Sequence, residues 1–361
     1  MHGFVDLQVN GYGGVSFSAR ELTRESLRAS CRAILAEGAC AAICPTVITS
    51  SAAIYAHVLP LLADLCDAAV AGEAEGFAGR ILGIHLEGPF ISPEPGAVGC
   101  HPAAHCAAPS AERFDALQAL ARGHVKLVTI AAEIEGAAPF CRSLVERGVT
   151  VSLGHMLADA AQVRALADAG ATLLTHLGNG LPNMVHRHET SLWASLAEDR
   201  LSAMIISDGQ HLRAETLTAF VRAKSLARII VTSDAAPVAG LPDGVYDCFG
   251  ARVCVEGATV RSASEPCLAG SGSLMLRCVN HLASIALIDT GSDRDVGASG
   301  GGGGGPRRMT RGELERVAYF NPLRALGVDP ARLQQEWGAR PALVRWCAAE
   351  GGGGHFERTD G

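Results

Sequence analysis

Several features that mark whole classes of protein are scarce or missing in this sequence of 361 residues. Lys and Arg number 30 against 37 Asp and Glu, for a net charge of −7, so the composition does not favour a nucleic-acid-binding surface. The N-terminus has no basic segment followed by an apolar core, so no secretory signal is predicted. No apolar run reaches the roughly 18 residues of a membrane span, since residues such as Glu37 and Glu133 interrupt the candidates. We therefore expect neither a nucleic-acid nor a membrane partner.

A disulfide framework is not expected either. The twelve cysteines are scattered along the chain without a CxxC pair, and Cys40, Cys44 and Cys254 lie in strand-like apolar runs. Buried free thiols in a reducing compartment are favoured over disulfides by this distribution. The sequence therefore predicts a cytoplasmic protein.

What the chain does contain is enough apolar sequence for a large folded core, because hydrophobic residues make up 48% of it. Apolar runs rich in β-formers predict strands at 4–10, 41–47, 81–87, 125–131, 149–155, 171–176, 202–208 and 228–234. Amphipathic segments between and after them predict helices near 21–37, 51–71, 111–122, 138–147, 158–169, 190–199, 213–224 and 273–289.

Eight strands that alternate with eight helices predict an α/β fold of the TIM type, a (β/α)₈ barrel. An open, doubly wound sheet is the alternative, but no GxGxxG follows an early strand. We expect the barrel over residues 1–290, with a small β insertion at 245–268 after the eighth strand. A Gly-rich linker is expected at 291–309, and a helical segment with a polar, frayed tail at 310–361.

Polar residues stand where several predicted strands end, which is the active-site face of such a barrel. Glu87 ends the third strand, His155 the fifth and His176 the sixth. One carboxylate and two imidazoles suit Zn²⁺ or Fe²⁺ and leave a position open for water. Taken singly, each histidine could instead be a hydrogen-bonded structural residue. The set as a whole favours a metal site.

Asp234 ends the eighth strand, and a carboxylate beside a metal-bound water can accept and return its proton; a helix N-cap or a structural ion pair is the alternative. His211 and His101 are weaker candidates for contacts with substrate. Arg187 could grip a phosphate or carboxylate, or be a solvated residue at a helix start.

Gln8 and Asn10 end the first strand, where a His-x-His pair would add ligands for a second metal ion. Neutral amides are poor Zn²⁺ ligands, which favours a single-metal site. The Asn10-Gly11 pair also suits a simple turn.

These segments, taken together and in order over roughly residues 4–327, resemble the N-acetylglucosamine-6-phosphate deacetylases of the amidohydrolase superfamily. The resemblance is carried by the runs FVDLQVNGYGG, GIHLEGPFIS, VSLGH, THLGNG, DGQHL, VTSDA and LAGSGSLM. It implies that Glu87, His155 and His176 bind the catalytic metal and that Asp234 is the general acid and base. It further implies that His101, Asn179, Gly180, Arg187 and His211 contact an aminosugar phosphate, and that Gln8 and Asn10 mark a single-metal member.

The chain also departs from the family pattern. It reads HLGNG at 176–180 where the family usually reads HLFNAM, and HRHETSLW where an R-E-P-G segment is usual. It begins almost at the first barrel strand and lacks a typical closing β-sandwich tail, so we expect the second β domain to be reduced or missing.

The sequence therefore predicts a metal-dependent deacetylase that removes the acetyl group from N-acetylglucosamine 6-phosphate or a similar aminosugar. One divalent ion is expected, with Zn²⁺ favoured and Fe²⁺ the alternative. A hydrolase of another N-acyl or cyclic amide is the first competing hypothesis, and a non-catalytic metal-binding barrel is the second. Barrels of this kind often pair, so a homodimer is an expected assembly.

Overall fold

The protein folds around eight parallel strands that are almost entirely buried. The structure, a computed structural model, describes residues 3–72, 76–264, 267–286, 307–331, 333, 343–349 and 353–359. The strands follow one another around the sheet in the order β1 (Phe4–Val9), β4 (Cys40–Ile48), β5 (Ile84–Glu87), β6 (Val125–Ile130), β7 (Thr150–Leu153), β8 (Leu173–Leu174), β9 (Ser202–Ile206) and β10 (Ile229–Thr232). A parallel bridge between Val9 of β1 and Ala235, three residues after the end of β10, joins the two edges of the sheet, so the sheet closes into a barrel.

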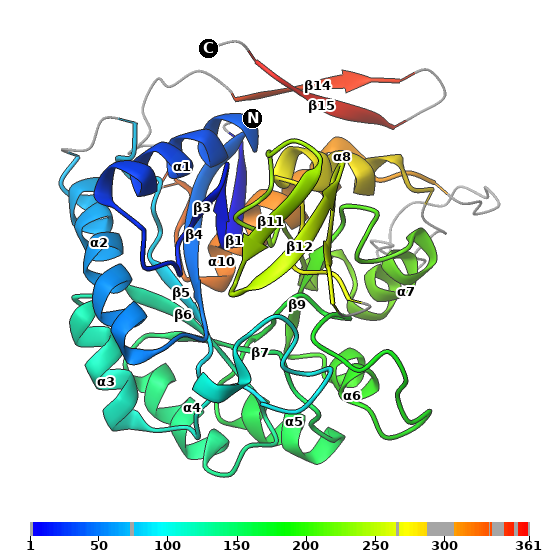
Figure 1. The fold of residues 1–361 in the computed structure, drawn as a ribbon. Coiled ribbons are helices and arrows are strands. Elements are labelled where there is room, and N and C mark those ends of the chain that lie inside the picture. The colour runs from blue at the N-terminus through cyan, green and yellow to red at the C-terminus, as the bar shows by residue number, and fades with distance from the viewer. Residues whose placement is uncertain are drawn as a thin grey trace.

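Helices alternate with these strands and surround them (Figure 1). They are α1 (Arg24–Glu37), α2 (Ala52–Val70), α3 (Ala111–Leu120), α4 (Ala137–Glu146), α5 (Ala160–Asp168), α6 (Ser191–Ala197), α7 (Ala214–Lys224) and α8 (Met275–Ser284). Several begin at side chains that accept a backbone N–H, as Thr23, Ser51 and Asp159 do. The (β/α)₈ barrel predicted from the sequence is confirmed. Strand β8 is shorter than predicted, because the chain turns directly after Leu174.

Helix α2 is long and apolar enough to cross a membrane by length and composition alone, with a mean hydropathy of 1.5. The sequence analysis did not expect such a segment. In this structure α2 is one of the outer helices of the barrel, and residues such as Tyr55 and Leu59 on one of its faces are buried. Its Asp64 and Asp67 make ion pairs with Arg122 on the α3–β6 connection.

The N-terminal end of the barrel is closed by the chain that follows the predicted linker. Helices α9 (Arg311–Glu315) and α10 (Asn321–Ala325) flank a π-helical turn, η3 (Arg316–Phe320). Tyr319 and Leu323 belong to the same apolar cluster as Val5 and Leu7 of β1. The Asn321 side chain donates hydrogen bonds to the carbonyls of Leu226 and Ile229, which attach the segment of α9, η3 and α10 to the barrel. Residues 291–306 of the predicted linker lie outside the described residues.

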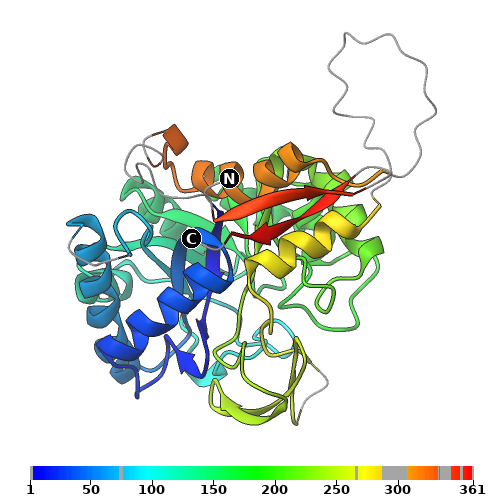
Figure 2. The same ribbon diagram turned by 90° about the horizontal axis from the view of Figure 1, so that it is seen from above.

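The predicted β insertion is a three-stranded antiparallel sheet of β11 (Gly244–Cys248), β12 (Ala251–Glu256) and β13 (Thr259–Ser262). One face buries Val253, Val255 and Val260 against residues such as Val238 in the segment after β10. The small sheet lies at the end of the barrel opposite α9 and α10 (Figure 2). It therefore stands over the carboxyl ends of the strands, beside a short hairpin of β2 (Gly11–Tyr12) and β3 (Val15–Ser16).

The C-terminal tail differs from the expectation of a frayed end. Strands β14 (Val344–Ala348) and β15 (Gly354–Arg358) pair as an antiparallel hairpin that lies beside the N-terminus and α8 (Figure 1). Phe356 is buried against Phe4 and Trp346, and its backbone exchanges two hydrogen bonds with the Asn280 side chain. The polar, Gly-rich composition masked this one buried aromatic residue. Among the described residues, the hairpin is the only sheet beyond the barrel, the insertion and the β2–β3 pair.

Candidate metal centre and active site

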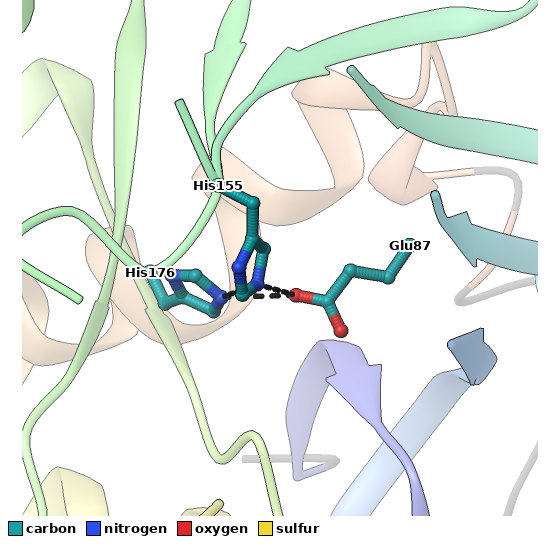
Figure 3. A group of neighbouring side chains, drawn as sticks. All are labelled: Glu87, His155 and His176. Atoms are coloured by element: carbon teal, nitrogen blue, oxygen red, sulfur yellow. Dashed lines mark hydrogen bonds and ion pairs between the residues drawn. The ribbon is translucent and has the colours of Figure 1, made fainter. Parts of the chain in front are cut away.

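Glu87, His155 and His176 converge at the carboxyl ends of three strands, β5, β7 and β8 (Figure 3). The Glu87 Oε1 atom lies 3.1 Å from His155 Nε2 and 2.9 Å from His176 Nε2, and the two nitrogens are 2.9 Å apart. All three residues are buried. Donor atoms on a tetrahedral Zn²⁺ with roughly 2.0–2.1 Å bonds lie about 3.3 Å apart, so this spacing fits three ligands of one cation.

Backbone conformation aims these side chains. His155 has a φ of 50° and His176 a φ of 29°, and Asp234 shares the left-handed region with a φ of 48°. L-residues rarely adopt this conformation because their Cβ atom crowds the following carbonyl. Each of the three comes two residues after a strand of the barrel. A left-handed turn at that point bends the chain sharply, which brings these polar groups together over the barrel mouth.

The hydrogen bonds around the three groups are compatible with a cation between them. His155 Nδ1 donates to the carbonyl of Ala97 at 2.7 Å, so a neutral ring in this orientation would turn an unprotonated Nε2 toward the Glu87 carboxylate. Two acceptors at 3.1 Å repel each other unless a proton or a metal ion lies between them. Burial lowers the pKa of His176, but its hydrogen bond to Glu87 raises that pKa overall. A metal ion that binds here would displace the proton.

Asp234 lies beside this cluster and is tied to it by Gln8. The Gln8 Nε2 group donates to Glu87 Oε1 at 2.7 Å and to Asp234 Oδ1 at 3.0 Å, and Asn10 Nδ2 donates to Asp234 Oδ1 at 2.8 Å. Both amides present N–H groups to the carboxylates, so in this orientation they position the site. Burial and the charge of Glu87 raise the pKa of Asp234 to about 7. A cation on Glu87 would lower that pKa.

His101 is a neutral hydrogen-bond donor at the same site. Its Nδ1 accepts the backbone N–H of Thr49, which leaves the proton on Nε2, 3.7 Å from Glu87 Oε2. Burial and the nearby His155 lower the pKa of His101 to about 3, so the ring stays uncharged near neutral pH. Its Nε2–H can therefore donate to a ligand oxygen near the cluster.

His211 is held by Asp208, the last residue of the strand predicted at 202–208, to which the sequence analysis assigned no role. The Asp208 carboxylate accepts from His211 Nδ1, from the backbone of Gln210 and His211, and from the Ser271 hydroxyl. Burial raises the pKa of Asp208, but its bonds to His211 outweigh that effect and hold the pKa at about 2. The charged carboxylate thus fixes the His211 ring and leaves Nε2 for other contacts.

A cavity of about 300 Å³ opens over these groups. The predicted residues that line it are Asn10, Glu87, His101, His155, His176, Asn179, Gly180, His211 and Asp234. Gln8 lies beneath them and bonds to Glu87 and Asp234. Arg187 is exposed on the loop after β8 and is not a lining residue, so its predicted contact with substrate stays a prediction.

The sequence HLGNG at 176–180, which departs from the usual HLFNAM of the family, has a local structural explanation. A Cβ atom on Gly178 would lie 2.9 Å from the Phe220 ring and 3.1 Å from Leu212, so those side chains fill the space that a larger residue would need. A Cβ atom on Gly180 would come 3.0 Å from His155 Nδ1. The two glycines therefore bring this loop close to the cluster.

Sequence reasoning missed part of the cavity wall. Arg261 on β13 and Phe249, Cys267 and Leu268 nearby also line the cavity. The sequence predicted the insertion that carries them, and of the four only Leu268 falls in a motif quoted for the resemblance, LAGSGSLM. Their approach to the strand ends is a property of the tertiary structure.

The site has a carboxylate and two imidazoles over the mouth of a (β/α)₈ barrel, and a further carboxylate lies beside them. This arrangement is typical of barrel hydrolases that use a metal ion. No protein-family model matches the chain. N-acetylglucosamine-6-phosphate deacetylase from Homo sapiens is 38% identical over 291 residues, covering 77% of this chain and 68% of the relative. N-acetylgalactosamine-6-phosphate deacetylase from Escherichia coli O157:H7 is 30% identical over 300 residues, covering 83% and 71%.

Solved structures of the same kind of enzyme also resemble this fold. N-acetyl-D-glucosamine-6-phosphate deacetylase from Mycobacterium smegmatis superposes with a TM-score of 0.78 at 26% identity, covering 99% of this chain and 85% of that one. A mutant of that enzyme in complex with N-acetyl-D-glucosamine-6-phosphate gives a TM-score of 0.75 at 27% identity, covering 90% and 77%. This chain belongs to the N-acetylglucosamine-6-phosphate deacetylase family, as its sequence motifs predicted.

Proposed function

We propose that this protein is a metal-dependent deacetylase that hydrolyses the acetamide of N-acetylglucosamine 6-phosphate or a similar aminosugar phosphate. The observation that carries the proposal is the convergence of Glu87, His155 and His176, with Asp234 joined to Glu87 through Gln8. These are the residues whose motifs resemble the metal ligands and the acid/base group of the family. Membership of the family supplies the substrate class.

The residues divide the chemistry between them. Glu87, His155 and His176 would hold a divalent cation, whose contribution is to polarise the amide carbonyl and to lower the pKa of water. Asp234 accepts the proton of the attacking water and then donates it to the departing amine nitrogen. Burial raises the pKa of Asp234 and a cation on Glu87 would lower it, which favours the acid form for the second step and the carboxylate for the first, respectively.

Two histidines complete the site. His101 donates from Nε2 to a substrate oxygen beside the cluster, and its neutral ring adds no charge there. His211 is oriented by Asp208 and presents Nε2 to the substrate near Asp234, where it supports the charge that develops on the carbonyl oxygen. Asn179 and Gly180 form the part of the loop after β8 that lines the cavity.

One Zn²⁺ ion is the proposed cofactor, with Fe²⁺ as the alternative. A Glu and two His form an established ligand set for catalytic zinc. Support for a single ion comes from the first strand, where Gln8 and Asn10 direct their NH₂ groups at carboxylates. Metal analysis of the purified protein should give one ion per chain. A ratio of two would contradict the single-metal site.

The activity is tested by acetate release from N-acetylglucosamine 6-phosphate, N-acetylgalactosamine 6-phosphate and unphosphorylated N-acetylglucosamine. We expect the phosphorylated sugars to be hydrolysed with the higher kcat/KM. Faster hydrolysis of a different N-acyl or cyclic amide would favour the competing hydrolase hypothesis. Bound metal without hydrolysis of any amide would favour a binding protein.

A cytoplasmic location and a homodimer complete the proposal. None of the twelve cysteines, all of which lie in the described residues, forms a disulfide, and thiols persist in reducing compartments. The homodimer stays a prediction from the behaviour of similar barrels, and light scattering of the purified protein would test it.

A further inference from the structure

The C-terminal hairpin carries a second group of metal-ligating side chains. Cys347 on β14 and His355 and Glu357 on β15 each offer one ligand atom, and these three atoms lie within 4.8 Å of one another. Among the described residues, the cluster in the active site is the only other group of this kind. In both views the hairpin lies apart from the insertion over the barrel mouth (Figure 1, Figure 2). The two groups therefore cannot share one ion.

The register of the hairpin places these residues on its outer face. Cys347 pairs directly with His355, and Arg345 pairs with Glu357. Because successive strand residues point to opposite faces, all four share the face opposite Phe356, whose side chain is buried. Cys347 is half-buried, whereas His355 and Glu357 are exposed. The three candidate ligands are thus accessible to ions in solution.

Hydrogen bonds already hold the candidate ligands close to one another. His355 Nε2 lies 3.2 Å from Glu357 Oε1, and Arg345 Nη2 lies 2.9 Å from Glu357 Oε2. The Cys347 thiol also forms a hydrogen bond with the Glu357 carboxylate. Arg345 therefore holds the carboxylate by one oxygen and leaves the other facing the imidazole. Ligand atoms on a tetrahedral Zn²⁺ lie about 3.3–3.6 Å apart, so small rotations of these side chains bring all three into range.

The chemical types of the three ligands select the class of metal. A thiolate, an imidazole and a carboxylate suit Zn²⁺, whereas Mg²⁺ and Ca²⁺ prefer ligand sets made of oxygen atoms. The thiolate and the carboxylate together balance the charge of a divalent cation, although Arg345 adds a positive charge nearby. A fourth position stays open for water. Without a metal ion, the same contacts are surface ion pairs, which contribute little to stability.

We propose that Cys347, His355 and Glu357 form a second, peripheral Zn²⁺ site that joins the two strands of the C-terminal hairpin. This inference does not depend on the proposed function. The three ligands lie close together in the sequence, so the unfolded chain can bind the ion as well, and the gain in global stability is small. An ion held by exposed ligands should be lost on dialysis against metal-free buffer. The site therefore adds nothing to the one ion per chain expected of the active site.

The test measures the alkylation of individual cysteines in dialysed protein, with and without added Zn²⁺, by mass spectrometry of peptides after treatment with iodoacetamide. A thiolate that is bound to a metal ion is not free to react, so Zn²⁺ should slow the modification of Cys347 by roughly 10-fold or more. Mg²⁺ at the same concentration should give no protection. Cys254, half-buried on β12 and outside both ligand groups, is the control within the same molecule, and its rate should not change.

Variants show whether the thiol acts with its partners. Loss of a mere hydrogen-bond partner of a ligand costs about 10- to 100-fold in metal affinity, so His355→Ala should raise the Zn²⁺ concentration that half-protects Cys347 by at least roughly 10-fold. Arg358→Gln is the matched control, because Arg358 is exposed on β15 and points to the opposite face.

Three outcomes would overturn the site. Equal protection in His355→Ala and Arg358→Gln would show that the thiol binds metal without the imidazole. Absence of protection in the wild type would leave the three residues as surface ion pairs only. Loss of protection in Glu87→Gln, which should behave like the wild type here, would place the effect at the active site. A protein that releases no acetate still gives a clear result, because alkylation of Cys347 needs no turnover.

Discussion

Residues in unfavourable backbone conformations form the centre of the site. His155, His176 and Asp234 all have positive φ values, at a cost of about 1–2 kcal/mol each. Apart from glycines, seven described residues share this conformation, and four of them, these three and Phe249, line the active-site cavity. Such strain persists where surrounding structure holds it, here through hydrogen bonds such as that of His155 Nδ1 to Ala97. The protein thus gives up local stability to orient ligands.

Asp234→Asn separates the acid/base role from structural ones. The Asn side-chain oxygen can still accept from Gln8 and Asn10, so we expect normal metal content and folding. It cannot carry the proton between water and amine, so kcat should fall by roughly 10²- to 10⁴-fold. Steady-state kinetics with metal analysis would check both statements. Asp199→Asn, on an exposed residue of the connection between α6 and β9, serves as the control. Near-normal turnover in Asp234→Asn would refute the assigned role.

At the scale of elements, the C-terminal hairpin shows how one side chain can order a polar segment. Phe356 is 2% exposed and fills the space between Phe4 of β1 and Trp346 of β14. Its backbone hydrogen bonds to Asn280 attach β15 to α8, so the hairpin covers apolar surface next to the start of the first strand.

Phe356→Ala should therefore lower the free energy of unfolding by about 3 kcal/mol, because it leaves a cavity between the hairpin and β1. The active site lies at the other end of the barrel, so kcat per folded molecule should not change. Urea unfolding followed by fluorescence would measure the loss. His355→Ala alters an exposed neighbour on the same strand and should stay within about 0.5 kcal/mol. Equal effects of the two substitutions would contradict the packing role.

At the scale of the whole molecule, metal binding should stabilise the fold. The three ligands come from β5, β7 and β8, which are far apart in the sequence, so the site exists only in the folded chain. At a free Zn²⁺ concentration of about 100 times the Kd, linkage predicts a gain of about 2.7 kcal/mol in the free energy of unfolding.

Thermal unfolding of metal-stripped protein with and without added Zn²⁺ measures this gain as an increase in Tm. Glu87→Gln should abolish most of the increase, and Glu94→Gln, an exposed residue on the loop after β5, should keep it. An equal increase in Glu87→Gln would place the stabilising metal elsewhere.

The order of strands and helices follows from the sequence alone, because parallel strands that are buried on both faces must be continuously apolar and the helices must be amphipathic. The ligand set was also predictable, since an ionisable group directly after a buried strand of a barrel has only the mouth to occupy. Glu87, His155, His176 and Asp234 were identified in this way.

Other features depend on contacts between distant segments, which leave no local pattern. The place of Arg261 in the cavity wall depends on how the insertion folds back over the strand ends. The hydrogen bond between Asp208 and His211 depends on the turn after β9. The ordered hairpin at the C-terminus depends on the packing of Phe356 against Phe4. Sequence periodicity reports which face of an element is buried, whereas only the tertiary structure decides what lies against it.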